Sequence, residues 1–316
     1  MTIHLLSTCN ANYTVPFRVT VHSLLEHLPE DCEVHWYVFW PDLVDGVESS
    51  FARLVAGRSV RFHWLTVSPE KLEGLPVRGH FVPHVYTRIL APACLPESVD
   101  RFLYLDADLL VLDDITPLWK TPLGDNVIAA VPDLAVPKVS SPMGLRLFRE
   151  LGIAPDAPYF NAGVYLADTH AWERRHIAQR AIEYLDRHAQ EINLLDQDAL
   201  NAVLCGQWKA LDVRWNLVAS LCGRSHYQPL GIDENELRRA QNRPGIVHYA
   251  GLLKPWAHPG IASFKVSRYL EVLEQACPKH RLQDSLKARS LGFYDRRLRG
   301  LFYPLEQFIW NKRKGF

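Results

Sequence analysis

Two aspartates, Asp106 and Asp108, stand one residue apart inside a strongly apolar stretch of the sequence. Leu-Tyr-Leu precedes them and Leu-Leu-Val-Leu follows. Charged groups among so many apolar neighbours are costly unless something compensates them. In an extended chain the side chains of residues i and i+2 point the same way, so both carboxylates can face one cation. Such hard oxygen ligands suit Mg²⁺ or Mn²⁺ shared with a diphosphate, whereas the alternative is a capping or turn pair at a strand end.

A second polar group follows a short β-rich run at residues 245–248. His248, Gly251 and Lys254 occur at intervals of three residues. An imidazole added to two carboxylates favours Mn²⁺ over Mg²⁺. Gly251 lets the backbone approach a phosphate closely, and Lys254 supplies a positive charge for it. The alternative is that His248 is a surface or core histidine without a ligand role.

Two further segments offer polar groups to a ligand. Asn161 precedes two small residues and an apolar run, so its amide can reach a hydroxyl-rich ligand. Asp196 and Gln197 open a predicted helix, where Asp196 also fits an N-cap. Asp196-Gln-Asp198 repeats the Asp-x-Asp pattern, so this pattern alone is not specific. For both segments a structural and a functional interpretation stay open.

The elements that position these residues alternate between strands and helices. This alternation is typical of a parallel or mostly parallel α/β sheet. In open sheets of this kind the ligand lies outside the carboxyl ends of the strands, where the polar residues occur. The predicted strands are residues 3–7, 33–40, 59–65, 126–131, 162–167 and 245–248, with a strand-like run at 102–112 that the two acids interrupt. The predicted helices are 16–28, 44–56, 84–93, 171–189 and 196–205.

The composition is that of an ordinary globular protein. Of 316 residues 48% are apolar, and 35 Lys and Arg balance 35 Asp and Glu, so no nucleic-acid partner is expected. The six cysteines include no Cys-x-x-Cys pair. The N-terminus lacks the basic and apolar regions of a signal peptide, and no apolar run approaches the roughly 20 residues that span a bilayer. We therefore expect a reduced, cytoplasmic protein.

The last 36 residues, 281–316, differ from the rest in charge. They contain nine Lys or Arg against three acidic residues, a net charge of +6, interleaved with seven Phe, Tyr or Trp. Basic and aromatic residues on short helices are typical of a segment that binds a membrane surface. The alternative is a C-terminal helix whose aromatic side chains pack on the main domain.

Four of these segments together resemble glycosyltransferase family 8, the retaining enzymes that include bacterial lipopolysaccharide galactosyl- and glucosyltransferases and glycogenin. The resemblance covers residues 1 to about 260, with the motifs in the family's order. The matching stretches are Leu-Asp106-Ala-Asp108, Phe-Asn161-Ala-Gly163-Val, Asp196-Gln197-Asp198-x-x-Asn201 and His248-x-x-Gly251-x-x-Lys254-Pro255-Trp256.

The resemblance implies a GT-A type fold: a Rossmann-like α/β domain over residues 1–260, with a mixed, mostly parallel sheet flanked by helices. Residues 261–316 would form a helical, basic and aromatic C-terminal extension. The family usually has an acidic residue in the first loop, where this sequence has Asn10. The implied roles are metal ligation by Asp106, Asp108 and His248; diphosphate contacts by Gly251 and Lys254; uracil and ribose contacts by Thr8, Asn10 and Tyr13; and contacts to the nucleotide sugar by Arg88, Ala107, Asp133, Asn161, Asp196 and Gln197.

The implied activity is transfer of glucose or galactose from UDP-glucose or UDP-galactose to a saccharide acceptor, with Mn²⁺ (or Mg²⁺) and with retention of configuration. The acceptor would be lipopolysaccharide or another lipid-linked oligosaccharide, reached from the inner face of the cell membrane through the tail. Gln197 would lie near the anomeric carbon, with Asp196 and Asp133 as alternatives for the catalytic role. We expect attack on the face that the leaving group vacates.

Two other functions compete with transfer. A sugar nucleotidyltransferase also uses acidic residues and Mg²⁺, but it needs a Gly-rich triphosphate loop near the N-terminus, and residues 6–13 contain no glycine. A UDP-sugar-binding protein without catalysis is the third interpretation. The complete set of Asp106, Asp108, His248 and Lys254 speaks against lost metal binding.

Overall fold

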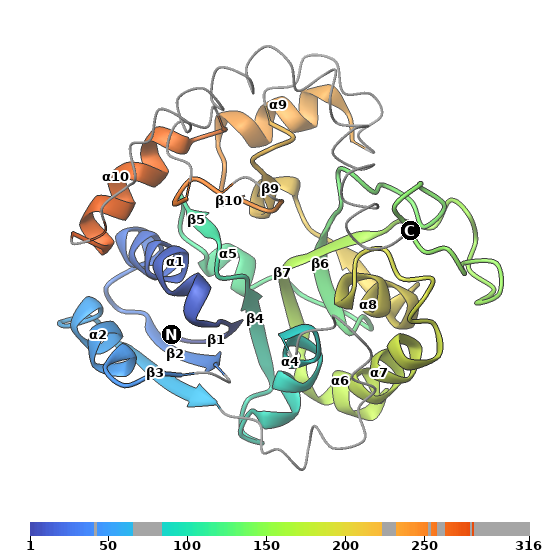
Figure 1. The fold of residues 1–316 in the computed structure, drawn as a ribbon, viewed down its shortest axis with the longest axis horizontal. Helices are drawn as coiled ribbons and strands as arrows, with labels where there is room; N and C mark the ends of the chain where they lie inside the picture. Colours follow the sequence, from blue (N-terminus) through green and yellow to red (C-terminus); the bar gives the residue numbers. More distant parts are fainter. Residues whose placement is uncertain are drawn as a thin grey trace.

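The computed structural model describes residues 1–40, 43–65, 84–222, 232–251, 254–257, 263–278 and 280. Within these ranges the strands form a seven-stranded and a three-stranded sheet (Figure 1). The large sheet has the order β3-β2-β1-β4-β7-β6-β8, and the small sheet has the order β5-β10-β9. The strands are β1 (Thr2–Thr8), β2 (Glu33–Phe39), β3 (Val60–Leu65), β4 (Arg101–Leu105), β5 (Leu109–Val111), β6 (Ile128–Pro132), β7 (Phe160–Asp168), β8 (Trp208–Ala210), β9 (Leu217–Val218) and β10 (Ile246–His248).

The large sheet is mostly parallel. Strands β3, β2, β1 and β4 run in one direction, β7 is antiparallel to both β4 and β6, and β8 is parallel to β6. The predicted mixed, mostly parallel α/β sheet is therefore confirmed. The carboxyl ends of β1, β4 and β6 meet the beginning of β7 at one edge, which is where ligands bind in open α/β sheets.

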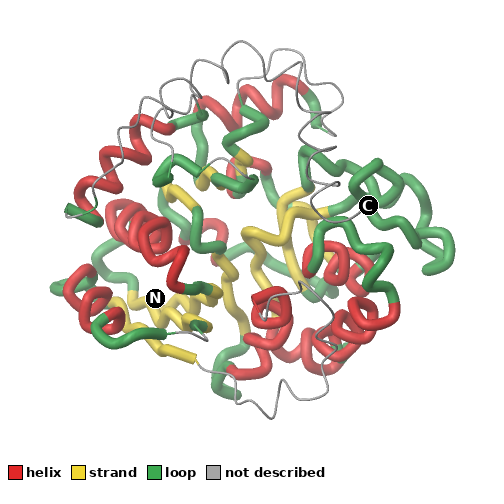
Figure 2. Tube along the Cα trace, viewed as in Figure 1, coloured by secondary structure: helices red, strands yellow, loops and turns green. Residues whose placement is uncertain are grey.

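Helices cover both faces of the large sheet, with the strands gathered between them (Figure 2). Alternate residues of one strand enter different cores: Leu103 and Leu105 of β4 pack with α1 and α2, whereas Phe102 and Tyr104 pack with α4, α6, α7 and α8. Burial on both faces explains why the sequences of the central strands β4 and β7 are almost continuously apolar. The helices are α1 (Thr14–His27), α2 (Val47–Leu54), α4 (His84–Leu90), α5 (Thr116–Trp119), α6 (Thr169–Arg174), α7 (Ile177–Arg187), α8 (Asp196–Leu204), α9 (Glu234–Asn242) and α10 (Val266–Ala276), with 3-10 turns η1 (Ala11–Tyr13), η2 (Ala91–Cys94) and η3 (Val213–Trp215).

The helix predicted over residues 171–189 is wrong as a single element. It is two helices, α6 and α7, and His176 between them has a left-handed φ of 50°. Trp172 and Ile177 are both buried in the same core. Positions five apart on one helix point about 140° away from each other, so the break is what lets both side chains face the sheet.

The C-terminal part of the described chain packs on the first helix. Helix α10 lies within the extension expected from residue 261 onward, yet Tyr269 and Leu273 share a core with Val19 of α1. The Nε of Arg18 also donates a hydrogen bond to the carbonyl of Ala276 (2.9 Å). The boundary at residue 260 stays a prediction, and the basic tail at 281–316 lies outside the described residues. Among the described helices, none is both long and apolar enough to span a bilayer.

Candidate active site

The chain leaves the large sheet for the small one at the two aspartates. Strand β4 ends at Leu105 and β5 begins at Leu109, so Asp106 and Asp108 lie in a turn between the sheets. The strand-like run is thus interrupted at the two acids, as predicted, but the extended geometry assumed for Asp106 and Asp108 is wrong. Backbone hydrogen bonds fix this turn instead: Asp106 N–H donates to Gly163 O (2.9 Å), and Tyr249 N–H donates to Asp108 O (3.0 Å).

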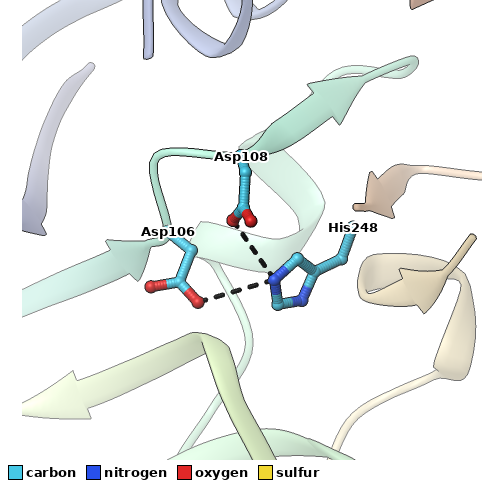
Figure 3. Close-up of side chains that lie close together, drawn as sticks. All are labelled: Asp106, Asp108 and His248. Atoms are coloured by element: carbon cyan, nitrogen blue, oxygen red, sulfur yellow. Dashed lines mark ion pairs between the residues drawn. The ribbon is translucent and has the colours of Figure 1, made fainter. Parts of the chain in front are cut away.

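Strand pairing brings His248 to this turn. Strand β10 is antiparallel to β5 with His248 opposite Leu109, the residue after Asp108. The imidazole Nε2 lies 3.3 Å from Asp108 Oδ1 and 3.6 Å from Asp106 Oδ2 (Figure 3). The three side chains each offer a ligand atom, and these atoms lie within 4.8 Å of one another. The structure thus brings together the three residues proposed as metal ligands.

The donor atoms fit a divalent cation. Octahedral ligands at about 2.1 Å from a metal ion are about 3 Å from each other, so the spacing around Nε2 needs to contract by only a few tenths of an ångström. Two carboxylates and an imidazole suit Mn²⁺ or Mg²⁺. Asp108 and His248 are only 6% and 5% exposed. Burying charged groups costs free energy, and a bound cation would offset that cost.

Gly163 of β7 provides the space for this cluster. A Cβ at position 163 would lie 2.4 Å from His248 Cε1 and 2.9 Å from Asp106 Oδ2. Both separations are far below van der Waals contact, so any larger residue would displace the imidazole or the carboxylate. The glycine of the Phe-Asn-Ala-Gly motif is therefore required by the close approach of the His248 and Asp106 side chains.

Two cations balance the acidic charge in the structure. Lys254 Nζ donates to Asp108 Oδ2 (2.6 Å) and to the carbonyl of Tyr249 (2.8 Å). Burial would raise the pKa of Asp108, but Lys254 and His248 outweigh this effect and hold the pKa of that carboxyl below its ordinary value. The Arg88 guanidinium bridges Asp106 and Asp196, with a distance of 2.8 Å from Nη1 to Asp196 Oδ2.

The residues expected around the sugar also converge. Asn161 Nδ2 donates to Asp133 Oδ2 (3.0 Å), and Gln197 Nε2 donates to the same oxygen (3.1 Å). Gln197 Oε1 accepts a hydrogen bond from Ala162 N–H (3.0 Å). Asp133 Oδ1 accepts from the N–H groups of Ala135 and Val136. These contacts leave the Asp133 carboxylate rigidly held beside Asn161 and Gln197.

Helix α8 presents Asp196 and Gln197 without using Asp196 as a cap. The helix begins at Asp196, and its N-cap is Leu195, which makes no side-chain capping bond and has a positive φ of 53°. The N-cap interpretation of Asp196 is therefore wrong. Asp198, the other acid of the second Asp-x-Asp, accepts hydrogen bonds from the Tyr159 hydroxyl (2.5 Å) and from the N–H groups of Asn193 and Leu194. Its role is to hold the turn that leads into the helix.

The first loop meets the His-x-x-Gly-x-x-Lys segment. The Tyr13 ring lies 5.9 Å from the ring of Trp256, and Lys254 Nζ lies 5.7 Å from the Tyr13 ring. Asn10 Oδ1 accepts a hydrogen bond from Asn12 N–H (2.9 Å), and so caps η1. Thr8 Oγ1 lies 2.9 Å from the Tyr104 hydroxyl.

Three residues of the site were not singled out from the sequence. Besides Gly163, which was seen only as part of a motif, these are Tyr104 and Asn216. The Tyr104 hydroxyl donates to Asp106 Oδ1 (3.1 Å) and accepts from Arg88 Nε (2.9 Å). A buried tyrosine hydroxyl needs a hydrogen-bond partner, so the position of Tyr104 two residues before Asp106 could have predicted this contact from the sequence. Asn216 lies between η3 and β9, where no sequence pattern predicts a role for it.

Several known proteins are similar to this chain in fold and in sequence. The structure superposes on the galactosyltransferase LgtC, solved in complex with donor and acceptor sugar analogues, with a TM-score of 0.69 and 26% identity over 91% of this chain and 99% of that one. General stress protein A of Bacillus subtilis is 28% identical over 80% of this chain and 87% of its own length. Lipopolysaccharide 1,2-glucosyltransferase of Escherichia coli K12 is 27% identical over 82% of this chain and 75% of its own length.

These similarities and the site define a glycosyltransferase with the GT-A fold. The sequence profile described as glycosyl transferase family 8 matches residues 4–259. The chain belongs to glycosyl transferase family 8.

Proposed function

We propose that this glycosyltransferase is a retaining hexosyltransferase that moves glucose or galactose from a UDP-sugar to a saccharide acceptor, such as lipopolysaccharide or another lipid-linked oligosaccharide. The observation that carries the proposal is the convergence of Asp106, Asp108 and His248 beside Lys254. A lipopolysaccharide glucosyltransferase and a galactosyltransferase are among its relatives, which supports both hexoses as candidates.

Asp106, Asp108 and His248 are the residues that would hold Mn²⁺ or Mg²⁺. When bound, the cation would supply Lewis-acid stabilisation of the negative charge that develops on the diphosphate. Lys254 adds a second positive charge beside the diphosphate. Its ammonium group, which now pairs with Asp108, would pair with a phosphate oxygen instead when the nucleotide binds. Gly251, with a φ of 104°, gives the segment between His248 and Lys254 a backbone shape that other residues rarely adopt.

Asp133, Asn161 and Gln197 form the sugar-binding side of the proposed site. Both ends of the Gln197 amide are bonded within the protein, and an amide is a poor nucleophile, so we assign Gln197 to positioning near the anomeric carbon. Attack by the acceptor hydroxyl on the face that UDP vacates, with the hydroxyl proton passing to a diphosphate oxygen, gives retention. Substantial turnover by Gln197→Ala would support this route, whereas a sugar trapped covalently on Asp196 or Asp133 would exclude it.

The test is hydrolysis of a panel of UDP-hexoses with and without Mn²⁺. Release of UDP that requires Mn²⁺ and is lost in Asp108→Asn supports the transferase. Asp100→Asn is the matched control, because Asp100 is 84% exposed at the opposite end of β4 and should retain activity. Formation of UTP and hexose 1-phosphate when pyrophosphate is added to the UDP-hexoses would indicate a sugar nucleotidyltransferase. Binding of UDP-sugars without any reaction would indicate a non-catalytic binding protein.

A peripheral location at the inner face of the cell membrane completes the proposal. It rests on the composition of residues 281–316, where nine basic residues and seven aromatic ones are interleaved. Such a segment would bring the enzyme to acceptors that are anchored in the membrane.

A further inference from the structure

Asn216 lies between the metal-site imidazole and the sugar-binding residues. It is 1% exposed and stands immediately before β9, the strand that pairs with β10 and His248. Its Oδ1 lies 3.0 Å from His248 Nδ1, and its Nδ2 donates to Asn161 Oδ1 (2.8 Å). The side chain therefore touches one proposed metal ligand and one proposed sugar contact.

Backbone groups determine the direction of the hydrogen bonds in this chain. Gly163 N–H donates to Asn161 Oδ1 (3.0 Å), so this atom must be the carbonyl oxygen of the amide. The Nδ2 of Asn161 correspondingly donates to the Asp133 carboxylate. Because Asn161 presents an acceptor, the atom of Asn216 that faces it must be the amide nitrogen. The remaining atom of Asn216 is then a carbonyl oxygen, which can only accept from His248.

We infer that Asn216 is a positioning residue that keeps the proton of His248 on Nδ1 and so presents the Nε2 lone pair to the space between Asp106 and Asp108. Only an unprotonated imidazole nitrogen can ligate a metal ion. Without the Asn216 acceptor, the tautomer protonated on Nε2 becomes accessible, and it cannot bind the cation. This inference rests on the proposed metal site and assigns the residue that prepares it.

Two substitutions separate the hydrogen bond from the packing of this side chain. Asn216→Leu has a similar size and no acceptor, whereas Asn216→Asp keeps an oxygen for the Nδ1 proton. Loss of a partner behind a ligating histidine typically weakens metal binding about 10–100-fold. We expect this loss of Mn²⁺ affinity in Asn216→Leu, measured by the electron paramagnetic resonance signal of free Mn²⁺. Asn216→Asp should lose less affinity than Asn216→Leu, because it keeps an acceptor for Nδ1, but it should stay below the parent, because its second oxygen faces the acceptor Asn161 Oδ1.

The matched control is Asn126→Leu. The Asn126 amide is half-buried and donates to Leu123 O (2.9 Å) ahead of β6, away from the site, so its loss should leave Mn²⁺ affinity unchanged. Asn216→Leu that binds Mn²⁺ as tightly as the parent would overturn the inference.

A spectrum of the parent protein tests the tautomer directly. With ¹⁵N-labelled histidine and Mg²⁺ as a diamagnetic ion, we expect a protonated Nδ1 in His248. A bare Nδ1 with a protonated Nε2 would refute the role of Asn216, even if Asn216→Leu does not fold. A parent protein that binds no Mn²⁺ would instead refute the metal site of the proposed function, and the Nδ1 signal would still decide the inference about Asn216.

Discussion

Gly163 shows how one missing side chain shapes the site. Replacement by alanine would place a methyl group 2.4 Å from the His248 ring. The same methyl group would lie 2.9 Å from Asp106 Oδ2, so the imidazole, the carboxylate or both must shift from their present positions. We expect Gly163→Ala to weaken Mn²⁺ binding about tenfold or more, measured by titration calorimetry.

Gly144→Ala is the control for steric strain. A Cβ at position 144 would lie 2.3 Å from Val139 O, in the segment between β6 and β7 and away from the aspartates. This variant should lower the melting temperature and retain Mn²⁺ affinity. Unchanged Mn²⁺ affinity in Gly163→Ala would show that the imidazole is not a ligand.

Arg88 couples two acids that come from different elements. It bridges Asp106 after β4 and Asp196 at the start of α8, and its side chain is 16% exposed. Removing one partner of a buried ion pair leaves uncompensated charge and costs about 3 kcal/mol or more. Arg88→Met should therefore reduce the free energy of unfolding by this amount in the presence of EDTA, measured by urea denaturation.

The metal provides a specific check on that result. Mn²⁺ bound beside Asp106 would replace part of the lost positive charge, so it should stabilise Arg88→Met more than the parent. Arg238→Met is a suitable control, because Arg238 pairs with Glu234 on the exposed surface of α9 and such pairs contribute little. Equal stability of Arg88→Met and the parent without metal would contradict the bridging role.

At the scale of elements, the strands of the large sheet were the most predictable feature. The predicted runs at 3–7, 33–40 and 59–65 match β1, β2 and β3 closely, because these runs are rich in β-branched and aromatic residues. This held even for the edge strand β3, which is only partly buried and contains Arg61 and His63. The acidic turn was harder to predict. Periodicity does not show that the chain changes sheets between Leu105 and Leu109, since this depends on pairing with β10, about 140 residues further on.

The same limit applies to the partners within the site. The residue types of Asn161, Asp196 and Gln197 suggested a ligand contact, but their hydrogen bonds depend on tertiary neighbours. Asn216 had no local pattern at all, because β9, the strand after it, has only two residues. The sequence therefore predicted the residues that could contact a ligand better than it predicted the hydrogen bonds that fix their side chains.

Strands β1, β2 and β3 carry a row of histidines that should make the fold sensitive to acid. His35 Nδ1 lies 3.0 Å from His63 Nε2, and the rings of His4 and His35 are 5.5 Å apart. Burial, with the neighbouring histidines, lowers the pKa of both His4 and His63 below 6.5. The unfolded chain therefore takes up protons at higher pH than the folded one, so stability is present above about pH 6.5 and decreases as pH falls through the lowered values.

Thermal unfolding measured between about pH 7.5 and pH 5 tests this dependence. We expect the melting temperature to fall with pH in the parent and to fall less in His4→Phe. Phenylalanine keeps an aromatic ring against Tyr37 and Trp119 and replaces a buried Nδ1 that has no hydrogen-bond partner. An equally steep decrease in His4→Phe would exclude His4 as a source of the acid sensitivity.

At the scale of the whole molecule, the catalytic domain and the basic tail should be separable. Helix α10 packs on α1 and ends at Ala276, and His280 Nε2 lies 3.4 Å from the carbonyl of Trp256. Truncation after His280 therefore keeps every described contact around Lys254 and Asp108. We expect the shortened protein to hydrolyse UDP-sugars as the full chain does and to sediment less with anionic vesicles.

Charge and chain length can be distinguished by a second variant of the full chain. Replacing Lys312, Arg313 and Lys314 by glutamine removes three of the nine basic residues of the tail and keeps its aromatic side chains. Each basic residue near an anionic surface contributes about 1 kcal/mol, so this variant should bind anionic vesicles at least tenfold more weakly, with a smaller effect of added salt. Neutral vesicles should not distinguish it from the parent. If the truncated protein sediments with anionic vesicles as the full chain does, the tail does not bind the membrane, and the acceptor must be reached through the catalytic domain.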